Sequence, residues 1–319
     1  MDRGAVDSRA VVSRAADSRA ADSRAATGRA VGCRANSMPM LHVPRTSRGG
    51  NRRRMLVGIV VCAAFLAAAV VAGRLLWDVA VATDFSEKNL APCAAHLFGT
   101  DWMGRDMLAR TLAGLSTSVF VGLLSAGCSA IIALALAVVA AFGGRAADAV
   151  VSWLTDLVMG IPHIVLLILV SYALGRGFWG VTVAVATTHW GGLARVLRAE
   201  ILQVKDAPHV KLAQASGVGR AQLVARHILP AVFPQLIVGA VLAFPHAILH
   251  EASITFLGFG LSADEPAIGV ILSEAMQYLS TGEWWLAVLP GAVLVAVVAA
   301  FDRIGSLIRA LLGAKSVQE

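Results

Sequence analysis

Charged side chains are scarce in this sequence. Of its 319 residues, 15% are charged and 57% are hydrophobic, and the mean hydropathy is +0.73. A soluble globular domain has about 25% charged residues, so this composition excludes that class and indicates an integral membrane protein. The net charge of +7 is concentrated in residues 1–54, which hold twelve arginines and four aspartates. Because the rest of the chain has no basic face interleaved with aromatic residues, we expect no nucleic-acid partner.

The sequence also lacks the short motifs of common enzymes and metalloproteins. Its four cysteines have no CxxC spacing, which excludes a disulfide scaffold and a cysteine-based zinc site. It has no GxxxxGK[ST] and no GxSxG motif. His250-Glu251 begins like the zinc protease motif HExxH, but Ile254 stands where the second histidine is needed. We therefore expect a chain that catalyses no reaction, hydrolyses no nucleotide and holds no cofactor.

The first 54 residues are of low complexity. An arginine recurs every five residues from Arg9 to Arg34, mostly as Ser-Arg-Ala, without the apolar stripe that a packed helix needs. We predict a disordered basic tail over residues 1–54 and a short C-terminal tail over residues 313–319.

Long hydrophobic runs dominate the rest of the chain. A bilayer core of about 30 Å needs about 20 mostly apolar residues in a helix. Six stretches qualify, and they are residues 55–77, 117–142, 150–174, 177–194, 232–257 and 285–301. The sequence thus predicts an all-α polytopic membrane protein with six transmembrane helices. Residues 55–97 would form the first helix and the start of an outer loop, and residues 98–312 would form the main transmembrane domain.

The distribution of Lys and Arg among the loops predicts an orientation. Residues 195–230 contain six basic and two acidic residues, whereas residues 258–284 contain four acidic residues and no basic one. Loops rich in Lys and Arg are retained on the cytoplasmic side of a membrane. With six spans, residues 195–230 and both termini are then cytoplasmic, and residues 78–116 face the other side.

One polar segment interrupts the apolar runs, with the sequence KLAQASGVGRAQLVARHILP over residues 211–230. Residues 207–216 and 220–228 can each form a short helix, with a break at Gly217 and Gly219. Pro230 is expected to stop the second helix before the next span. Such a pair of helices can dock into a cleft of a soluble partner and transmit its movement to the attached spans. A plain solvated loop that carries basic residues explains the pattern equally well.

A few ionisable residues lie inside the predicted spans. They are Asp156 and His163 in the third span, His189 in the fourth, and His246, His250 and Glu251 in the fifth. A charge at mid-membrane costs about 2.5 to 3.5 kcal/mol, so such residues tend to face protein or a water-filled path. His163, His246, His250 and Glu251 are therefore expected to face neighbouring helices or a water-filled path.

Two of these histidines are candidate metal ligands. His246 and His250 are four residues apart and share one helical face, where neutral imidazoles, with His163 as a third candidate ligand, can receive a transition metal such as nickel. Two histidines do not complete a coordination shell. Hydrogen bonding to neighbouring helices is therefore the alternative role for this pair.

The polar segment resembles the cytoplasmic coupling motif of ABC importer permeases. In that motif Glu-Ala-Ala is followed by three residues, Gly, nine residues, and then Ile, any residue and Leu-Pro. Gly217 and Leu229-Pro230 fall at the matching spacing, whereas Lys211 and His227 stand where Glu and Ile are usual. The resemblance implies a set of ATPase-coupling residues, which are Lys211, Ala213, Gly217, Arg220, His227, Leu229 and Pro230.

Four further stretches are similar to one subfamily of these permeases. They are FGTDWMGRDMLARTLAG from Phe98, HWGGLARVLRAEIL from His189, HEASITFLGFGLS from His250 and LSEAMQYL from Leu272. Together they resemble the C-type subunit of the dipeptide, oligopeptide and nickel permeases. The resemblance extends over about residues 98–312, roughly two thirds of the chain.

This resemblance implies a fold like that of type I ABC importer permeases, with a cytoplasmic coupling-helix loop. It implies a non-enzymatic subunit in the bacterial inner membrane that forms half of a translocation pathway for nickel, a metal chelate, or di- or oligopeptides. The fifth span contributes to that pathway in the family, which implies substrate-pathway roles for His163, His246, His250 and Glu251. The alternative for Glu251 is a packing role, because Glu251-Ala252-Ser253 matches a packing motif of the family. The implied partners are a second permease subunit, two cytoplasmic ATPases and an extracytoplasmic binding protein. The alternative is a stand-alone secondary transporter or channel, which often has two related halves. No such internal repeat is visible, which favours the importer.

Overall fold

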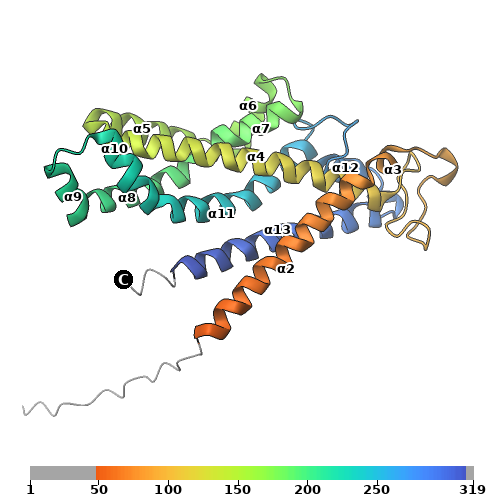
Figure 1. Cartoon of the computed structure of the whole chain (residues 1–319). Coiled ribbons are helices and arrows are strands. Elements are labelled where there is room, and N and C mark those ends of the chain that lie inside the picture. The colour runs from red at the N-terminus through yellow and green to blue at the C-terminus, as the bar shows by residue number, and fades with distance from the viewer. Residues whose placement is uncertain (1–47, 314–319) are drawn as a thin grey trace, which may run out of the picture. The chain divides into compact units, whose positions relative to one another are not determined.

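The computed structural model describes the backbone of residues 48–313, and the predicted tails at residues 1–47 and 314–319 lie outside the described residues. Within this range every regular element is a helix, and the one β-type pairing is an isolated bridge between Thr100 and Asp106. The elements in chain order are α2 (Arg48–Leu75), α3 (Trp77–Val81), η1 (Phe85–Glu87), α4 (Met107–Phe142), α5 (Gly144–Gly160), α6 (His163–Ala173), α7 (Gly177–Thr188), α8 (Trp190–Lys205), α9 (Pro208–Ala215), α10 (Arg220–Leu223), η2 (Val224–Ile228), α11 (Leu229–Phe256), α12 (Ile268–Ala275), η3 (Leu279–Thr281) and α13 (Trp285–Gly313). Figure 1 shows their arrangement. The predicted all-α class is confirmed.

The described helices provide four or five membrane spans rather than the predicted six. The four that are long and apolar enough are Arg52–Leu75, Met107–Phe142, Arg220–Phe256 and Trp285–Leu312. A fifth is available if α5 and α6, which are bent by 98° at their junction, count as one span. The apolar runs were therefore located correctly, but two of them are not single straight helices.

Two predicted spans are interrupted, each for a local reason. The predicted third span breaks at Pro162, because proline disfavours the helical conformation of the residue before it and Ile161 is extended, with φ −84° and ψ 138°. The predicted fourth span is divided at His189 into α7 with 12 residues and α8 with 16. Neither of these helices reaches the length of about 20 residues that a bilayer core requires.

Helix α4 is the central element of the described chain. It packs against α2, α7, α8 and α11, and small residues occupy much of its buried surface. A Cβ atom on Gly114 would lie 3.0 Å from the backbone of Ala267, and one on Gly122 would lie 2.8 Å from Ile248. Small residues allow helices in a membrane to approach closely, so these positions determine how near α11 and α12 come to α4.

The two halves of α4 belong to different hydrophobic clusters. Met107, Leu115 and Val119 in its first half pack with buried residues of α12 and α13. Ala133, Ala137 and Ala141 in its second half pack with buried residues of α8 and of residues 206–230. Helix α4 thus links the loops before it to the polar segment.

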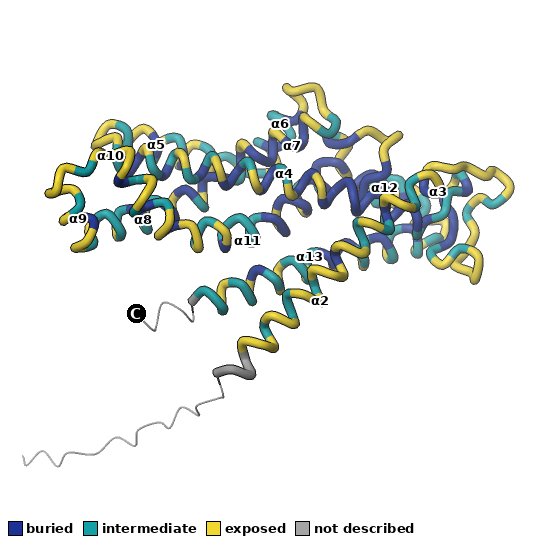
Figure 2. The backbone as a smooth tube through the Cα atoms, in the orientation of Figure 1, coloured by how far each residue is buried: buried dark blue, intermediate teal, exposed yellow. Residues whose placement is uncertain are grey.

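Helix α2 packs against α4 and α13 within the unit Ser47–Glu319, so the predicted boundary at residue 97 does not separate two domains. The predicted tail also ends earlier than residue 54, because α2 spans Arg48–Leu75. Much of α2 faces away from the chain, as Figure 2 shows. Val60, Val61 and Leu75 are 65%, 61% and 78% exposed, which provides an apolar surface for lipid or another subunit.

A buried group of charges holds the loop before α4. Arg110 Nη1 donates to Asp101 Oδ2 over 2.9 Å and to Glu274 Oε2 over 2.6 Å, and its Nη2 donates to Glu274 Oε1 over 3.0 Å. Arg105 Nε donates to the same Asp101 oxygen over 2.7 Å. The side chains of Arg110 and Asp101 are only 3% and 4% exposed. Because these residues lie on the loop, on α4 and on α12, the group ties the three together.

The conformation of the same loop explains why Gly99-Thr100-Asp101 and Gly104-Arg105-Asp106 occur in the sequence. Asp101 Oδ1 accepts the backbone N–H groups of Met103 and Arg105 over 2.8 and 2.9 Å. Gly104 has a φ of +75°, and a Cβ atom there would collide with the backbone of Asp84, so this position requires glycine. Asp106 caps α4, because its Oδ1 accepts the N–H of Ala109 over 2.8 Å.

His96 lies between two carboxylates of this loop. Its Nδ1 is 2.8 Å from Asp106 Oδ2 and its Nε2 is 3.1 Å from Glu87 Oε2. Both ring nitrogens can donate only when the imidazole is protonated. The hydrogen bond to Asp106 accordingly raises the pKa of His96 above its ordinary value of 6.5, and the bond to Glu87 acts in the same direction.

Replacing Arg110 by leucine is expected to lower the free energy of unfolding by about 3 kcal/mol, because Arg105 would remain as the single cation beside the two carboxylates of Asp101 and Glu274. Equilibrium unfolding of the purified chain in detergent measures this loss. Arg195→Leu is the matched control, since Arg195 pairs with Asp156 while their side chains are 51% and 70% exposed. That variant is expected to change the stability by less than about 1 kcal/mol. An equal loss in both variants would contradict the structural role of the buried group.

The stability of the loop before α4 is also expected to depend on pH through His96. Because the folded pKa is raised, the stabilisation is fully present below pH 6.5 and is lost as pH rises through the folded pKa. In the His96→Gln variant, the melting temperature is expected to fall less than in the wild type as pH rises from 6.5 through the folded pKa of His96. Melting curves between about pH 5.5 and 8.5 for both proteins test this. A slope that is unchanged in the variant would exclude His96 as its source.

Candidate functional site

The polar segment, now defined as residues 206–230, begins with a short helix that ends in a glycine turn. Helix α9 starts at Pro208, whose missing N–H and fixed φ suit a first helical position. At its end the N–H of Val218 donates to Ala213 O over 3.2 Å and the N–H of Gly217 donates to Gln214 O over 3.0 Å. These two bonds form a Schellman motif, and Gly217 has the left-handed φ of +84° that this motif requires. The predicted bend at Gly217 is therefore a helix C-cap.

The second part of the segment runs directly into the next span, so the predicted stop at Pro230 is wrong. Helix α10 continues through the π-helical turn η2 into α11, and Arg220–Phe256 forms one helix of 37 residues. The N–H of Leu229 donates to Val224 O, five residues earlier. Pro230 has no N–H to donate, and the wider π turn accommodates that loss where a regular α-helix would break.

Buried side chains anchor the polar segment to the helix bundle. Val210, Leu223 and Ile228 are 0%, 1% and 0% exposed and pack in one cluster with residues of α8 and α4. Lys205 Nζ also donates to Ala141 O of α4 over 2.8 Å. On the side of the segment that faces away from the bundle, Leu212 is 70% exposed. The segment is thus fixed on one side and presents an apolar side chain on the other.

Most of the predicted coupling residues lie on the accessible side of the segment. Lys211, Gly217, Arg220 and Pro230 are exposed, and Ala213, His227 and Leu229 are partly buried. Lys211 Nζ is 3.1 Å from Asp206 Oδ1, and these side chains are 60% and 77% exposed. An ion pair with that exposure contributes little to stability, which leaves Lys211 available for contact with another chain.

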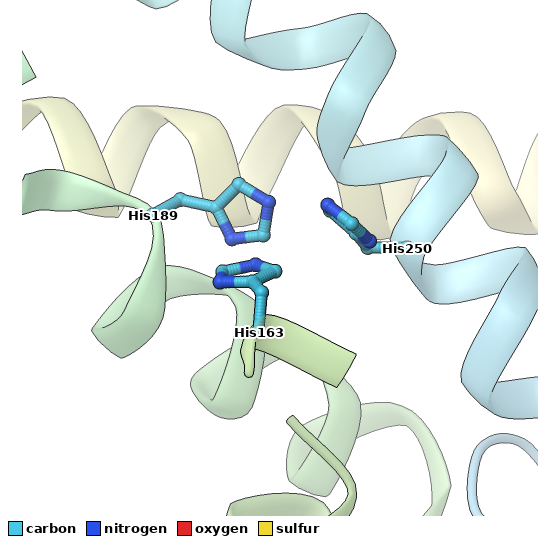
Figure 3. Close-up of side chains that lie close together, drawn as sticks. All are labelled: His163, His189 and His250. Atoms are coloured by element: carbon cyan, nitrogen blue, oxygen red, sulfur yellow. The ribbon is translucent and has the colours of Figure 1, made fainter. Parts of the chain in front are cut away.

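A second candidate site is a cluster of three histidines, which Figure 3 shows in close-up. His163 is the first residue of α6, His189 lies at the junction of α7 and α8, and His250 lies on α11. The ring centroids of His163 and His189 are 4.4 Å apart, those of His163 and His250 are 4.5 Å apart, and those of His189 and His250 are 4.9 Å apart. One nitrogen atom of each ring lies within 4.8 Å of those of the other two. All three residues are partly buried.

Hydrogen bonding leaves two of these rings with an unpaired buried nitrogen. Nδ1 of His189 is 3.0 Å from Val185 O, and because a carbonyl oxygen only accepts, Nδ1 carries the proton. Nε2 of His189 then has a lone pair, and it is buried with no hydrogen-bond partner in the described chain. Nε2 of His163 is likewise buried and has no hydrogen-bond partner in the described chain.

The predicted pair of His246 and His250 is not the group that the structure brings together. His246 is exposed, and its Nδ1 is 3.2 Å from Leu242 O. Sequence spacing placed His246 correctly on the face of α11 that carries His250. The nearest rings, however, come from α6 and α7, and neither their identity nor their distance can be read from the spacing within α11.

Glu251, also predicted for the pathway, is fully buried. Its Oε1 accepts the hydroxyl of Thr255 over 3.0 Å, and its Oε2 has no hydrogen-bond partner in the described chain. Its neighbours Ala252 and Ile248 belong to the cluster that packs against α4. In this structure Glu251 therefore contributes to packing between α11 and its neighbours rather than to an accessible surface.

Residues 130–313 match the protein family described as "Binding-protein-dependent transport system inner membrane component". The chain belongs to this family. It is 29% identical over 250 residues to the dipeptide transport system permease protein DppC of Bacillus subtilis, which covers 78% of each chain. It is 34% identical over 227 residues to a putative peptide permease protein of Brucella suis biovar 1, covering 71% of this chain and 75% of the relative.

A solved structure agrees with this assignment at the level of fold. A crystal structure described as an amino acid ABC transporter with histidines superposes with a TM-score of 0.50 at 18% identity, covering 62% of this chain and 92% of that chain. The chain is thus a multi-pass membrane protein and a non-catalytic permease subunit of an ABC importer. The family match decides between the two functional hypotheses, against a stand-alone secondary transporter or channel.

Proposed function

We propose that this chain and a second permease subunit together form the translocation pathway of an importer for di- or oligopeptides. The similarity to peptide permeases over 71% and 78% of the chain is the observation that carries this proposal. In this assembly two cytoplasmic ATPases drive transport, and an extracytoplasmic binding protein delivers the substrate. Nickel or a metal chelate is the second candidate substrate, and the cluster of three histidines is the observation that favours it.

The proposed orientation places the polar segment and both termini in the cytoplasm. The excess of Lys and Arg over residues 195–230 and their absence from residues 258–284 support it. The buried bonds from Arg110 to Asp101 and Glu274 also support it, because they hold the loop before α4 and the acidic loop together. The polar segment packs with the opposite half of α4.

We assign ATPase docking to the exposed side of the polar segment. A docked partner would contact Leu212 and Lys211, while Val210, Leu223 and Ile228 fix the segment to the bundle. The first part of the segment follows α8 after Lys205, and the second part is continuous with α11. A movement of the segment would therefore act on both helices, and these helices carry His189 and His250 at or near their far ends.

Transport assays in a host without peptide uptake test the substrate. The chain, produced with its partner subunits and binding protein, is expected to restore accumulation of radiolabelled dialanine. An ATPase subunit without its phosphate-binding lysine is the control and should abolish the uptake. If the complete transporter accumulates radioactive nickel and no dipeptide, the peptide proposal fails and the second candidate replaces it.

Replacing Gly217 by valine tests the docking role of the polar segment. The left-handed φ of +84° costs a branched residue about 1–2 kcal/mol, which would reduce dialanine uptake about 5-fold to 30-fold by disturbing the end of α9. Gly219→Val is the matched control, since Gly219 has a φ of −63° and no atoms near the position of a Cβ. Membrane levels of both variants should equal those of the wild type. Uptake that is normal for Gly217→Val, or equally reduced for both, would contradict the docking role.

A further inference from the structure

We infer that His163, His189 and His250 together bind one divalent transition-metal ion. The inference rests on the geometry of this cluster and does not depend on which solute the importer carries. The three rings come from three separate elements, and two of them lie at breaks in the helical structure, after Pro162 and between α7 and α8. Irregular backbone inside a membrane protein is tolerated where it lines a cavity or a binding site.

The distances between the ring nitrogens of the three histidines suit a zinc ion. An imidazole nitrogen lies about 2.0–2.1 Å from a bound zinc ion, which places two ligand atoms of a tetrahedral site about 3.4 Å apart. One ring nitrogen of each histidine lies within 4.8 Å of one ring nitrogen of the other two. The last torsion of a histidine side chain has a broad energy minimum, so small ring rotations can close that difference.

The hydrogen bonds around the cluster favour a metal over mutual bonding of the rings. The N–H···O bond from His189 Nδ1 to Val185 O fixes the tautomer and directs the Nε2 lone pair away from the backbone. A backbone carbonyl in this role is the usual outer-shell partner of a metal-binding histidine. Among the described residues no hydrogen bond joins any two of the three rings, and Nε2 of both His163 and His189 is buried without a partner. An unpaired buried polar atom costs about 1–3 kcal/mol, and a bound ion would remove that cost.

The donor set also determines which ions fit. The cluster contains three imidazoles and, among the described residues, no carboxylate or thiol. Neutral imidazole suits zinc, copper, nickel and iron, whereas calcium and magnesium prefer oxygen ligands. Three protein ligands leave at least one coordination position for water or for a donor atom of a carried solute.

Cobalt binding to the purified full-length chain in detergent tests the inference, because the visible absorption of Co²⁺ reports its ligands. The wild type is expected to bind one equivalent. His163→Gln and His250→Gln should each weaken binding at least about tenfold, since loss of an outer-shell partner alone usually costs 10-fold to 100-fold. His246→Gln is the matched control, one helical turn from His250 and outside the cluster, and it should change the affinity less than about twofold.

An X-ray absorption measurement on the wild type loaded with Zn²⁺ needs no variant and so remains decisive if a substitution impairs folding. Its expected result is a first shell with three imidazole ligands. The inference fails if fewer than three imidazoles are found, if the wild type binds no cobalt, or if His246→Gln weakens binding as much as His250→Gln. Neither measurement involves transport, so failure here and failure of the proposed function are distinguishable.

Discussion

The buried guanidinium of Arg110 is the interaction on which the arrangement of this chain most depends. It joins the loop before α4 to the start of α4 itself and to α12, through Asp101 and Glu274. The group contains two guanidinium and two carboxylate groups, since Arg105 pairs with the same two acids, and the loss of any one member would leave an uncompensated buried charge. The bonds therefore position the first turns of α4 accurately, and the other main helices pack against α4.

From that fixed end, α4 controls the packing of the bundle through residue size. Its glycines and alanines let α11 and α12 approach at distances that a larger side chain would prevent. The opposite half of α4 packs with α8 and the anchors of the polar segment. One helix thus contacts both the loop before it and the segment to which we assign ATPase docking.

Breaks in the helices are as informative as the helices themselves. The extended backbone before Pro162 and the interruption at His189 bring the ends of α6 and α7 beside α11, where the three imidazoles meet. At Pro230 the outcome is reversed, since a π turn keeps the helix continuous and connects the polar segment to α11. A proline in an apolar run therefore identifies a position of irregular hydrogen bonding, and the neighbouring residues decide whether the chain bends there.

The sequence by itself determined the all-α membrane class, the positions of the apolar runs and the glycine turn at residue 217, because these follow from composition, periodicity and spacing along the chain. The family followed from the resemblance of its motifs to those of known permeases. Tertiary structure decided the rest. It added His189 to the cluster of His163 and His250 and left His246 outside it, placed Glu251 in the packed interior and revealed the partners of Arg110. The physical reason is that spacing defines which residues share a face of one helix, whereas the partners of that face depend on how separate helices bend and pack.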